Sequence, residues 1–312
     1  MIMGSNMAEC HPVAFRWAMK SKEKGGKIIH VATRFTRTSA MADIHAPIRA
    51  GSDIVFLGAL ITYFINRPKW NGDSFYKEYL VNYTNAATLI NGDYKDTDDL
   101  DGVFSGLSQD GASYATASWQ YQRNESKVKA TGNEKTYTEL IASRVPGTVK
   151  TDLTLQDPKS VFQIMKKHYA RYTPEMVERV CGCSKEKFVQ VAEALLANSG
   201  RDRTGSIVYA VGWTQHTTGT QIIRTAGMVQ EMLGNMGRPG GGILALRGHA
   251  SIQGSTDIPT LYHSWSGYLA AADARRNHDT LKDYILTETQ ITSFWSNTPK
   301  YAVSMLKAWF GD

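Results

Sequence analysis

The chain has 312 residues, a formal net charge of +6 at pH 7, 42% hydrophobic and 21% charged residues. This is the composition of a globular protein whose length suits one large domain or two ordinary ones. The sequence has no run of about 18 apolar residues that could cross a membrane. Its start lacks a basic region followed by an apolar stretch, so no secretory signal is predicted.

The positive charge is concentrated near the start, because residues 1–50 carry +5 of the net +6. Such a balance suits the phosphates of a cofactor or of nucleic acid. Lys20, Lys22 and Lys24 are better explained as the solvated end of a helix. Arg34 and Arg37 differ because they follow a predicted strand. Nucleic-acid binding is disfavoured, since the basic residues are not interleaved with stacking aromatics in a repeated pattern.

The first 65 residues alternate between predicted strands and helices. Residues 1–6 indicate the end of a strand and a turn of small residues, and Pro12 suits the first turn of a helix that Gly25 and Gly26 end. Residues 27–32 predict a strand buried on both faces, as in a parallel sheet. An apolar helix follows through Ile65, and Ser52 and Asp53 are suitable N-caps for it.

The second half continues the alternation. Helices are predicted at 161–172, from Thr173-Pro174 onward, at 185–196 and at 220–233, and a strand at 206–211. Residues 91–160, rich in Asp, Gly, Ser, Thr and Asn, predict an insertion that holds some short strands. The chain after Gly267 is predicted to be irregular. These patterns predict an α/β fold with mostly parallel sheets and flanking helices.

The same patterns divide the chain into four parts. Residues 1–90 and 161–240 are predicted to form one nucleotide-binding α/β domain, interrupted by the insertion at 91–160. Residues 241–312 are predicted to begin an adjoining domain.

Three strand-to-helix turns carry small or polar residues. They are Gly4-Ser5-Asn6, residues 33–38 and residues 212–215. In parallel sheets such turns meet at the carboxyl ends of the strands, where backbone N–H groups suit pyrophosphate and ribose. The sequence has no G-x-G-x-x-G after the first strand and no Walker A motif, so an ordinary NAD enzyme and a P-loop NTPase are both disfavoured.

The three cysteines indicate neither a disulfide framework nor a complete metal site. Cys181 and Cys183 are spaced too closely for the usual zinc pattern, and Cys10 stands alone. An iron–sulfur cluster needs four thiolates, which this sequence does not contain. Buried or loop thiols are therefore predicted, and no residue is assigned as a metal ligand.

Several motifs follow one another along the chain. They are Gly4-Ser-Asn-Met-Ala-Glu-Cys-His-Pro12, Arg34-Phe-Thr-Arg-Thr38, Ala46-Pro-Ile-Arg-Ala-Gly-Ser-Asp53, Gly212-Trp-Thr-Gln-His216, Leu233-Gly-Asn-Met-Gly237, Ala245-Leu-Arg-Gly-His249 and Ile252-Gln-Gly254. In this order and spacing they resemble the molybdopterin oxidoreductases, and among them the respiratory, selenocysteine-type formate dehydrogenase catalytic subunits. The resemblance implies that the adjoining domain at 241–312 lies on the substrate or pterin side. The resemblance covers most of the chain and is weakest through residues 91–150.

The resemblance implies a Rossmann-like domain that binds molybdopterin guanine dinucleotide. It further implies a bis(molybdopterin guanine dinucleotide) cofactor with molybdenum or tungsten, which oxidises formate to carbon dioxide. Electrons would leave through iron–sulfur clusters, beginning with a 4Fe-4S cluster bound by the family's preceding N-terminal region. The implied partners are formate, an iron–sulfur electron-transfer subunit and, as a further candidate, a membrane cytochrome subunit. The implied location is the periplasm.

Site residues are carried over by position. Gly4, Ser5, Asn6, Glu9, Arg34, Gly51 and Asp53 would hold one guanine nucleotide, and Gly212, Gln215, Gly248 and His249 would line the pterin or the second nucleotide. Arg247 would orient formate, since a planar guanidinium grips a carboxylate through two parallel N–H bonds. The family usually has Asp-Pro at the positions of Ala32-Thr33, so one acceptor for guanine or ribose is missing here.

The family's selenocysteine or cysteine metal ligand and its closing C-terminal domain have no counterpart in this sequence. We therefore expect a central piece of a longer subunit that is inactive alone. Two alternatives stay open: another molybdopterin oxidoreductase, of the nitrate or polysulfide reductase type, and a non-catalytic module that binds a guanine-nucleotide cofactor.

Overall fold

The computed structural model describes residues 1–124, 148–246, 252–258, 260 and 263–311. The chain divides into two compact units, one of residues 1–122 and 150–248, the other of residues 123–149 and 249–312. The domain boundaries expected from the sequence stay a prediction.

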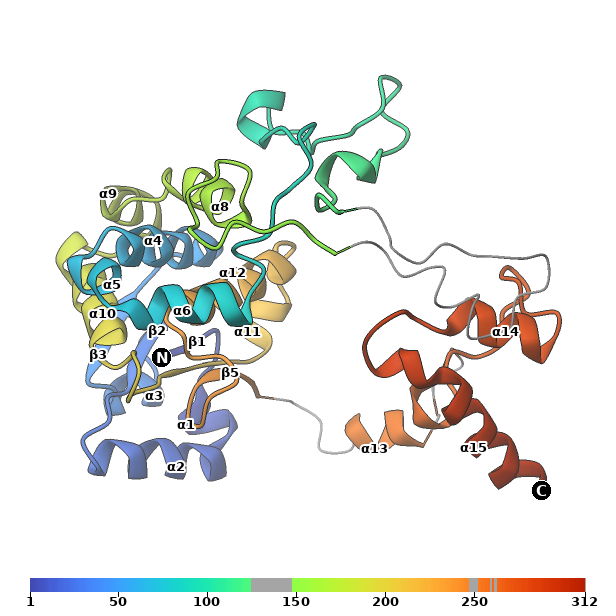
Figure 1. The fold of residues 1–312 in the computed structure, drawn as a ribbon. Coiled ribbons are helices and arrows are strands. Elements are labelled where there is room, and N and C mark those ends of the chain that lie inside the picture. The colour runs from blue at the N-terminus through green and yellow to red at the C-terminus, as the bar shows by residue number, and fades with distance from the viewer. Residues whose placement is uncertain (125–147, 247–251, 259, 261–262, 312) are drawn as a thin grey trace. The chain divides into compact units, whose positions relative to one another are not determined.

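The first unit is built on a parallel sheet of five strands in the order β3-β2-β1-β4-β5 (Figure 1). The strands are β1 (Ile2–Met3), β2 (Ile29–Ala32), β3 (Ile44–Pro47), β4 (Ser206–Tyr209) and β5 (Gly242–Ala245). Ile2 of β1 aligns with His30 on one side and with Val208 on the other. Chain order reverses beside β1, and such a switch point leaves a crevice at the carboxyl ends of the strands. The predicted α/β fold is confirmed.

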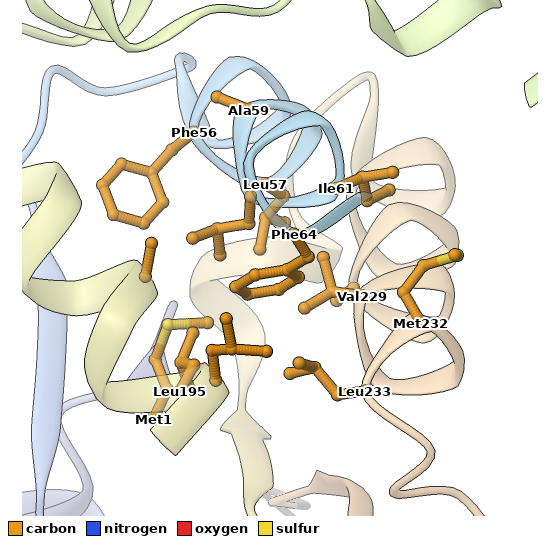
Figure 2. Close-up of a cluster of buried hydrophobic side chains, with 14 of the residues drawn as sticks. Met1, Phe56, Leu57, Ala59, Ile61, Phe64, Leu195, Val229, Met232 and Leu233 are labelled. Atoms are coloured by element: carbon orange, nitrogen blue, oxygen red, sulfur yellow. The ribbon is translucent and has the colours of Figure 1, made fainter. Parts of the chain in front are cut away.

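Alternating side chains of the strands enter two separate cores, one on each face of the sheet. On one face, Met3, Val31 and Ile207 pack with the helices α4 (Asp53–Ile65), α10 (Lys185–Ala197) and α12 (Gly219–Met232). Figure 2 shows this cluster, with Phe64 of α4 lying near Val229 and Leu233. On the other face, Ile2 and Val208 pack with Phe15 of α2 (Pro12–Glu23). Helices therefore cover both faces, as parallel sheets require.

Shorter helices and turns complete this unit. They are α1 (Met7–Cys10), α3 (Arg37–Met41), α5 (Pro68–Gly72), α6 (Ser74–Tyr83), α8 (Val161–Tyr169), α9 (Pro174–Met176), the π-helix η3 (Val177–Cys181), α11 (Val211–Thr214) and the 3₁₀ turns η1 (Thr97–Leu100) and η2 (Thr116–Trp119). The helix predicted from Pro12 begins there, and the one predicted through Ile65 begins at Asp53.

Three local expectations need correction. Val211 begins α11 and does not extend the strand, which ends at Tyr209. The described residues of the 91–160 segment form isolated antiparallel bridges, such as Leu107 with Tyr114, in place of the expected short strands. Strands β3 and β5 were not anticipated at all.

The described part of the second unit consists of helices joined by irregular segments. It contains α13 (Ile252–Asp257), η4 (Ser266–Tyr268), α14 (Leu281–Glu288), η5 (Phe294–Asn297) and α15 (Thr298–Phe310). The prediction that the chain is irregular after Gly267 is therefore wrong from Leu281 onward, where helices follow. The His278 side chain is only 3% exposed and lies 2.8 Å from the Glu288 carboxylate. Its ring packs against Tyr284, which in turn packs against Trp265. Within the described ranges, no helix is long and apolar enough to cross a membrane.

Candidate functional site: a crevice at the carboxyl ends of the strands

A crevice of about 380 Å³ opens where the turns after β1, β2, β3 and β4 converge. This is the place at which parallel α/β sheets bind ligands, and the volume falls in the range of small-molecule sites. Its lining comprises Gly4, Ser5, Asn6, Val31, Ala32, Thr33, Arg34, Thr36, Ile48, Ala50, Asp53, Gly212 and His216.

Two glycines let the central turns approach each other closely. Gly4 has φ +71°, and a Cβ there would lie 2.6 Å from the Trp213 ring. A Cβ on Gly212 would lie 2.6 Å from the Gly4 carbonyl oxygen, which accepts the Gly212 N–H at 3.1 Å. Backbone therefore packs against backbone at the switch point, which only glycine permits.

The turn after β1 presents one hydroxyl that no described residue satisfies. Ser5 Oγ is buried in this part of the structure without a hydrogen-bond partner, although buried polar atoms are normally paired. Asn6 is held in place, since its Oδ1 accepts from Thr38 Oγ1 at 2.9 Å and its Nδ2 donates to Glu9. The Ser5 hydroxyl is thus free to donate a hydrogen bond to a bound ligand.

Charge in the crevice comes from Arg34 and Asp53. The exposed guanidinium of Arg34 has no ion pair or hydrogen bond to any described residue, so it can take an anion. Asp53, only 5% exposed, accepts from Trp213 Nε1 at 3.1 Å, and burial raises the pKa of its carboxyl. Because Asp53 is an acceptor at the start of α4, its end of the crevice suits N–H or hydroxyl donors rather than phosphate.

The turn that carries Asp53 is fastened to the end of the π-helix η3. The Arg49 N–H donates to the Cys181 carbonyl at 2.8 Å, and its guanidinium donates to the carbonyls of Arg179 and Val180 at 2.8 and 3.0 Å. Cys181 Sγ in turn donates to the Ser52 carbonyl at 3.5 Å. The prediction that Cys181 and Cys183 are buried thiols agrees with exposures of 1% and 0%.

A larger hollow of about 680 Å³ lies beside α6, but its charged side chains are less available to a ligand. Both of its arginines are occupied. Arg201 pairs with Glu78 at 2.7 Å, and Arg238 donates to the carbonyls of Gly200 and Gly234 at 2.7 and 3.2 Å. The smaller crevice, with a free cation and an unsatisfied hydroxyl, is therefore the better candidate site.

The crevice gathers six of the residues predicted for the cofactor: Gly4, Ser5, Asn6, Arg34, Asp53 and Gly212. Three others do not line it. Glu9 stands behind Asn6 and pairs with Arg37 at 3.4 Å, Gly51 provides a φ of +82° in the turn before Asp53, and Gln215 is exposed after α11. Arg247, Gly248 and His249 lie outside the described residues.

Besides Ala32 and Thr33, five lining residues were not among the predicted site residues: Val31, Thr36, Ile48, Ala50 and His216. His216 adjoins the predicted Gln215, and Ala50 adjoins Gly51, so each belongs to a turn that the sequence had marked. Ala32 and Thr33, which stand where the family usually has Asp-Pro, are part of the lining. No group of three or more His, Cys, Asp or Glu residues in the described ranges is arranged to hold a metal ion.

Several known proteins are similar to this chain. The formate dehydrogenase-O major subunit of Escherichia coli and the formate dehydrogenase 2 subunit alpha (cytochrome c-553) of Nitratidesulfovibrio vulgaris are each 42% identical over the whole chain, and the formate dehydrogenase subunit alpha of Megalodesulfovibrio gigas is 39% identical. The chain spans 28% of the length of each relative. Acetylene hydratase from Pelobacter acetylenicus aligns with 75% of this chain and 21% of its own at a TM-score of 0.43 and 16% identity.

The molybdopterin oxidoreductase model matches residues 1–290, which is nearly the entire chain. The formate dehydrogenase subunits are similar to this chain over its whole length. The chain therefore belongs to the molybdopterin oxidoreductase family.

Proposed function

We propose that this chain is the nucleotide-binding part of a formate dehydrogenase catalytic subunit, and that its crevice holds a guanine nucleotide of a bis(molybdopterin guanine dinucleotide) cofactor. The observation that carries the proposal is the free Arg34 cation beside the unsatisfied Ser5 hydroxyl, at the switch point of a parallel sheet. The similarity to formate dehydrogenase subunits over the full chain supports the same assignment.

Different side chains bind different parts of the nucleotide. Arg34 and Ser5 Oγ donate to the pyrophosphate, and a guanidinium is suited to phosphate oxygens. Asp53 accepts from the base or the ribose, because its buried carboxylate has one oxygen beyond the 3.1 Å bond from Trp213. Ala32 offers no acceptor, so Asp53 carries more of the recognition than it would beside a second carboxylate.

When bound, the metal of the cofactor, molybdenum or tungsten, supplies the two-electron oxidation of formate to carbon dioxide. We assign Arg247 to grip the formate carboxylate through two parallel N–H bonds, on the strength of its place in the sequence. Gly212 and Gln215, with Gly248 and His249, are proposed to lie along the pterin or the second nucleotide. Gly51 shapes the turn that presents Asp53, and Glu9 orients Asn6.

Within the whole enzyme, we propose that electrons pass to a 4Fe-4S cluster and then to an iron–sulfur subunit. A cytochrome is a further candidate acceptor, since one relative is named for cytochrome c-553. The periplasm is the proposed location. The selenocysteine-type ligand is likewise proposed from the resemblance of the motifs.

Calorimetric titration of the 312-residue chain with GDP tests the crevice, with ADP as the comparison. Arg34→Gln should weaken GDP binding by about tenfold to a hundredfold, the equivalent of one charge-assisted hydrogen bond. Arg16→Gln, which removes an exposed charge from α2, should leave binding unchanged. Equal loss in both variants would show a diffuse charge effect, and no GDP binding would overturn the nucleotide assignment.

Metal analysis of the complete subunit separates the enzyme from the alternative of a cofactor-binding module. Stoichiometric molybdenum or tungsten together with formate oxidation supports the dehydrogenase. In that subunit, Arg247→Lys should lower formate turnover greatly while cofactor content is kept. If the subunit reduced nitrate or polysulfide and did not oxidise formate, it would be a nitrate or polysulfide reductase of the same family.

A further inference from the structure

A histidine occupies a place in the sheet where an aliphatic side chain would be ordinary. His30 lies in β2, is 0% exposed, and aligns with Ile2 of the neighbouring strand. It is outside the lining of the crevice, so it is not placed to touch a bound nucleotide. Burial of a polar ring is unfavourable unless both ring nitrogens are hydrogen-bonded.

Both ring nitrogens of His30 have partners. Nε2 lies 3.1 Å from the Ser5 carbonyl oxygen, and Nδ1 lies 2.8 Å from Ser39 Oγ. A carbonyl oxygen can only accept, so Nε2 carries the proton and Nδ1 accepts from the Ser39 hydroxyl. Ser39 Oγ in turn accepts the Thr36 N–H at 2.9 Å. Burial lowers the pKa of His30 to about 4, so the ring is neutral near pH 7 and this tautomer is available.

The bonds form one directional chain from Thr36 through Ser39 and His30 to Ser5. Its two ends belong to two different turns, after β2 and after β1, and both Thr36 and Ser5 line the crevice. We propose that His30 is a positioning residue that fixes the separation of these two turns, and hence the fit of the nucleotide pyrophosphate. This inference rests on the proposed function of the crevice.

A second connection runs beside the first and supplies a control. Thr38 Oγ1 donates to Asn6 Oδ1 at 2.9 Å and accepts the Ala8 N–H at 2.9 Å. It joins α3 to the same turn after β1 without using the histidine. Removal of Thr38 Oγ1 therefore disturbs that turn through a separate set of bonds.

The test compares His30→Val with His30→Gln by GDP titration of the full chain. Valine suits a buried parallel strand, which offsets part of the loss of the two hydrogen bonds, so the protein should stay folded with only a modest fall in melting temperature, yet GDP binding should weaken about tenfold. Glutamine offers one donor and one acceptor and should restore GDP binding to within about twofold of wild type. Wild-type affinity in His30→Val, or melting and binding that fall together in both variants, would overturn the proposal.

A double-mutant cycle tests the chain of bonds itself. Ser39→Ala and His30→Val each break the same chain, so the double variant should lose no more GDP affinity than one single variant. Thr38→Val breaks the other connection and should add its effect to that of His30→Val. Additive losses for Ser39 and His30 would contradict a shared chain.

A measurement without nucleotide keeps the inference separate from the proposed function. The ring ¹⁵N shifts of His30 should report a neutral ring with its proton on Nε2 at pH 7. Amide exchange at Thr36 should rise in His30→Val and return toward wild type in His30→Gln. If wild type binds no GDP, the nucleotide assignment fails while these signals still decide the coupling of the turns. A proton on Nδ1, or unchanged Thr36 exchange, would refute the role of His30.

Discussion

The contact between the Gly4 and Gly212 turns gives a quantitative prediction. In Gly212→Ala the new methyl group would lie 2.6 Å from the Gly4 carbonyl oxygen and 2.9 Å from its carbon, both of them backbone atoms that cannot rotate away. Gly212 is absent from the positive-φ glycines of the described chain, so the cost is steric rather than conformational. Overpacking costs about 1–3 kcal/mol, and loss of the 3.1 Å bond from Gly212 N–H to Gly4 adds ~1 kcal/mol. The free energy of unfolding should fall by about 2–4 kcal/mol.

Urea unfolding followed by circular dichroism measures the change, and GDP titration reports the crevice. Gly72→Ala is the matched control, because a Cβ at Gly72 meets nothing within 4 Å and its φ is ordinary. That variant should be neutral or stabilised by up to about 1 kcal/mol. A Gly212→Ala protein as stable as the Gly72→Ala control, with GDP affinity unchanged, would refute the close approach of the two turns.

Three other predictions follow from buried polar groups. Asp53→Asn should be more stable than wild type at pH 7. Burial raises the pKa of the Asp53 carboxyl, so the wild type loses stability as the pH rises from about 4 and the group ionises. In urea titrations the difference in stability should vanish at pH 3, and a difference that is constant with pH would contradict this. In the native protein the exposed Cys10 should react quickly with a thiol reagent, whereas the buried Cys181 and Cys183 should react only in urea. Burial raises the pKa of both buried thiols, to about 11 for Cys183. Fast reaction of all three thiols in the native protein would count against this. Trp70→Phe should cost about 1–2 kcal/mol in the same urea assay through loss of its 2.7 Å buried hydrogen bond, and an unchanged midpoint would argue against that bond.

The strands that the sequence predicted lie in the middle of the sheet, and the two that it missed lie at the edges. Residues 28–32 are apolar except for His30, because β2 is buried on both faces. By contrast, β3 includes His45 and ends at Pro47, and β5 starts at Gly242 with only one fully buried position. Edge strands pair on one side only, so they tolerate proline and polar residues and lose the pattern that reveals a strand.

The helices near the end of the chain were missed for a related reason. In α14 only Tyr284 is buried, and in α15 the buried residues are Thr298, Ala302 and Met305. A small unit buries a narrow stripe of each helix, so most positions are polar or exposed. Periodicity is then weak, and propensity alone did not distinguish these segments from loops.

The sequence predicted the site residues that lie close to the ends of strands, and it missed residues further along the turns. Gly4, Arg34 and Gly212 lie within three residues of the ends of β1, β2 and β4, and parallel strands bring such residues to one edge whatever the details of the loops. Thr36 and His216 lie further along their turns, and their positions depend on how each turn folds back. Sequence spacing does not contain that information, because it arises from contacts between turns that are distant in the chain.

Those contacts also explain how a crevice made of four loops can be ordered before a ligand arrives. Gly212 rests on Gly4, Trp213 holds Asp53, and His30 joins the turns after β1 and β2. Each wall is thus fixed by a neighbouring turn rather than by the ligand, which lowers the entropy lost on binding. Among the described residues, the free Arg34 guanidinium, the hydroxyls of Ser5 and Thr36 and one oxygen of the Asp53 carboxylate then remain available to a ligand. Substitutions in the frame should therefore lower affinity even though they touch no ligand atom, whereas substitutions at Arg34 should spare the fold.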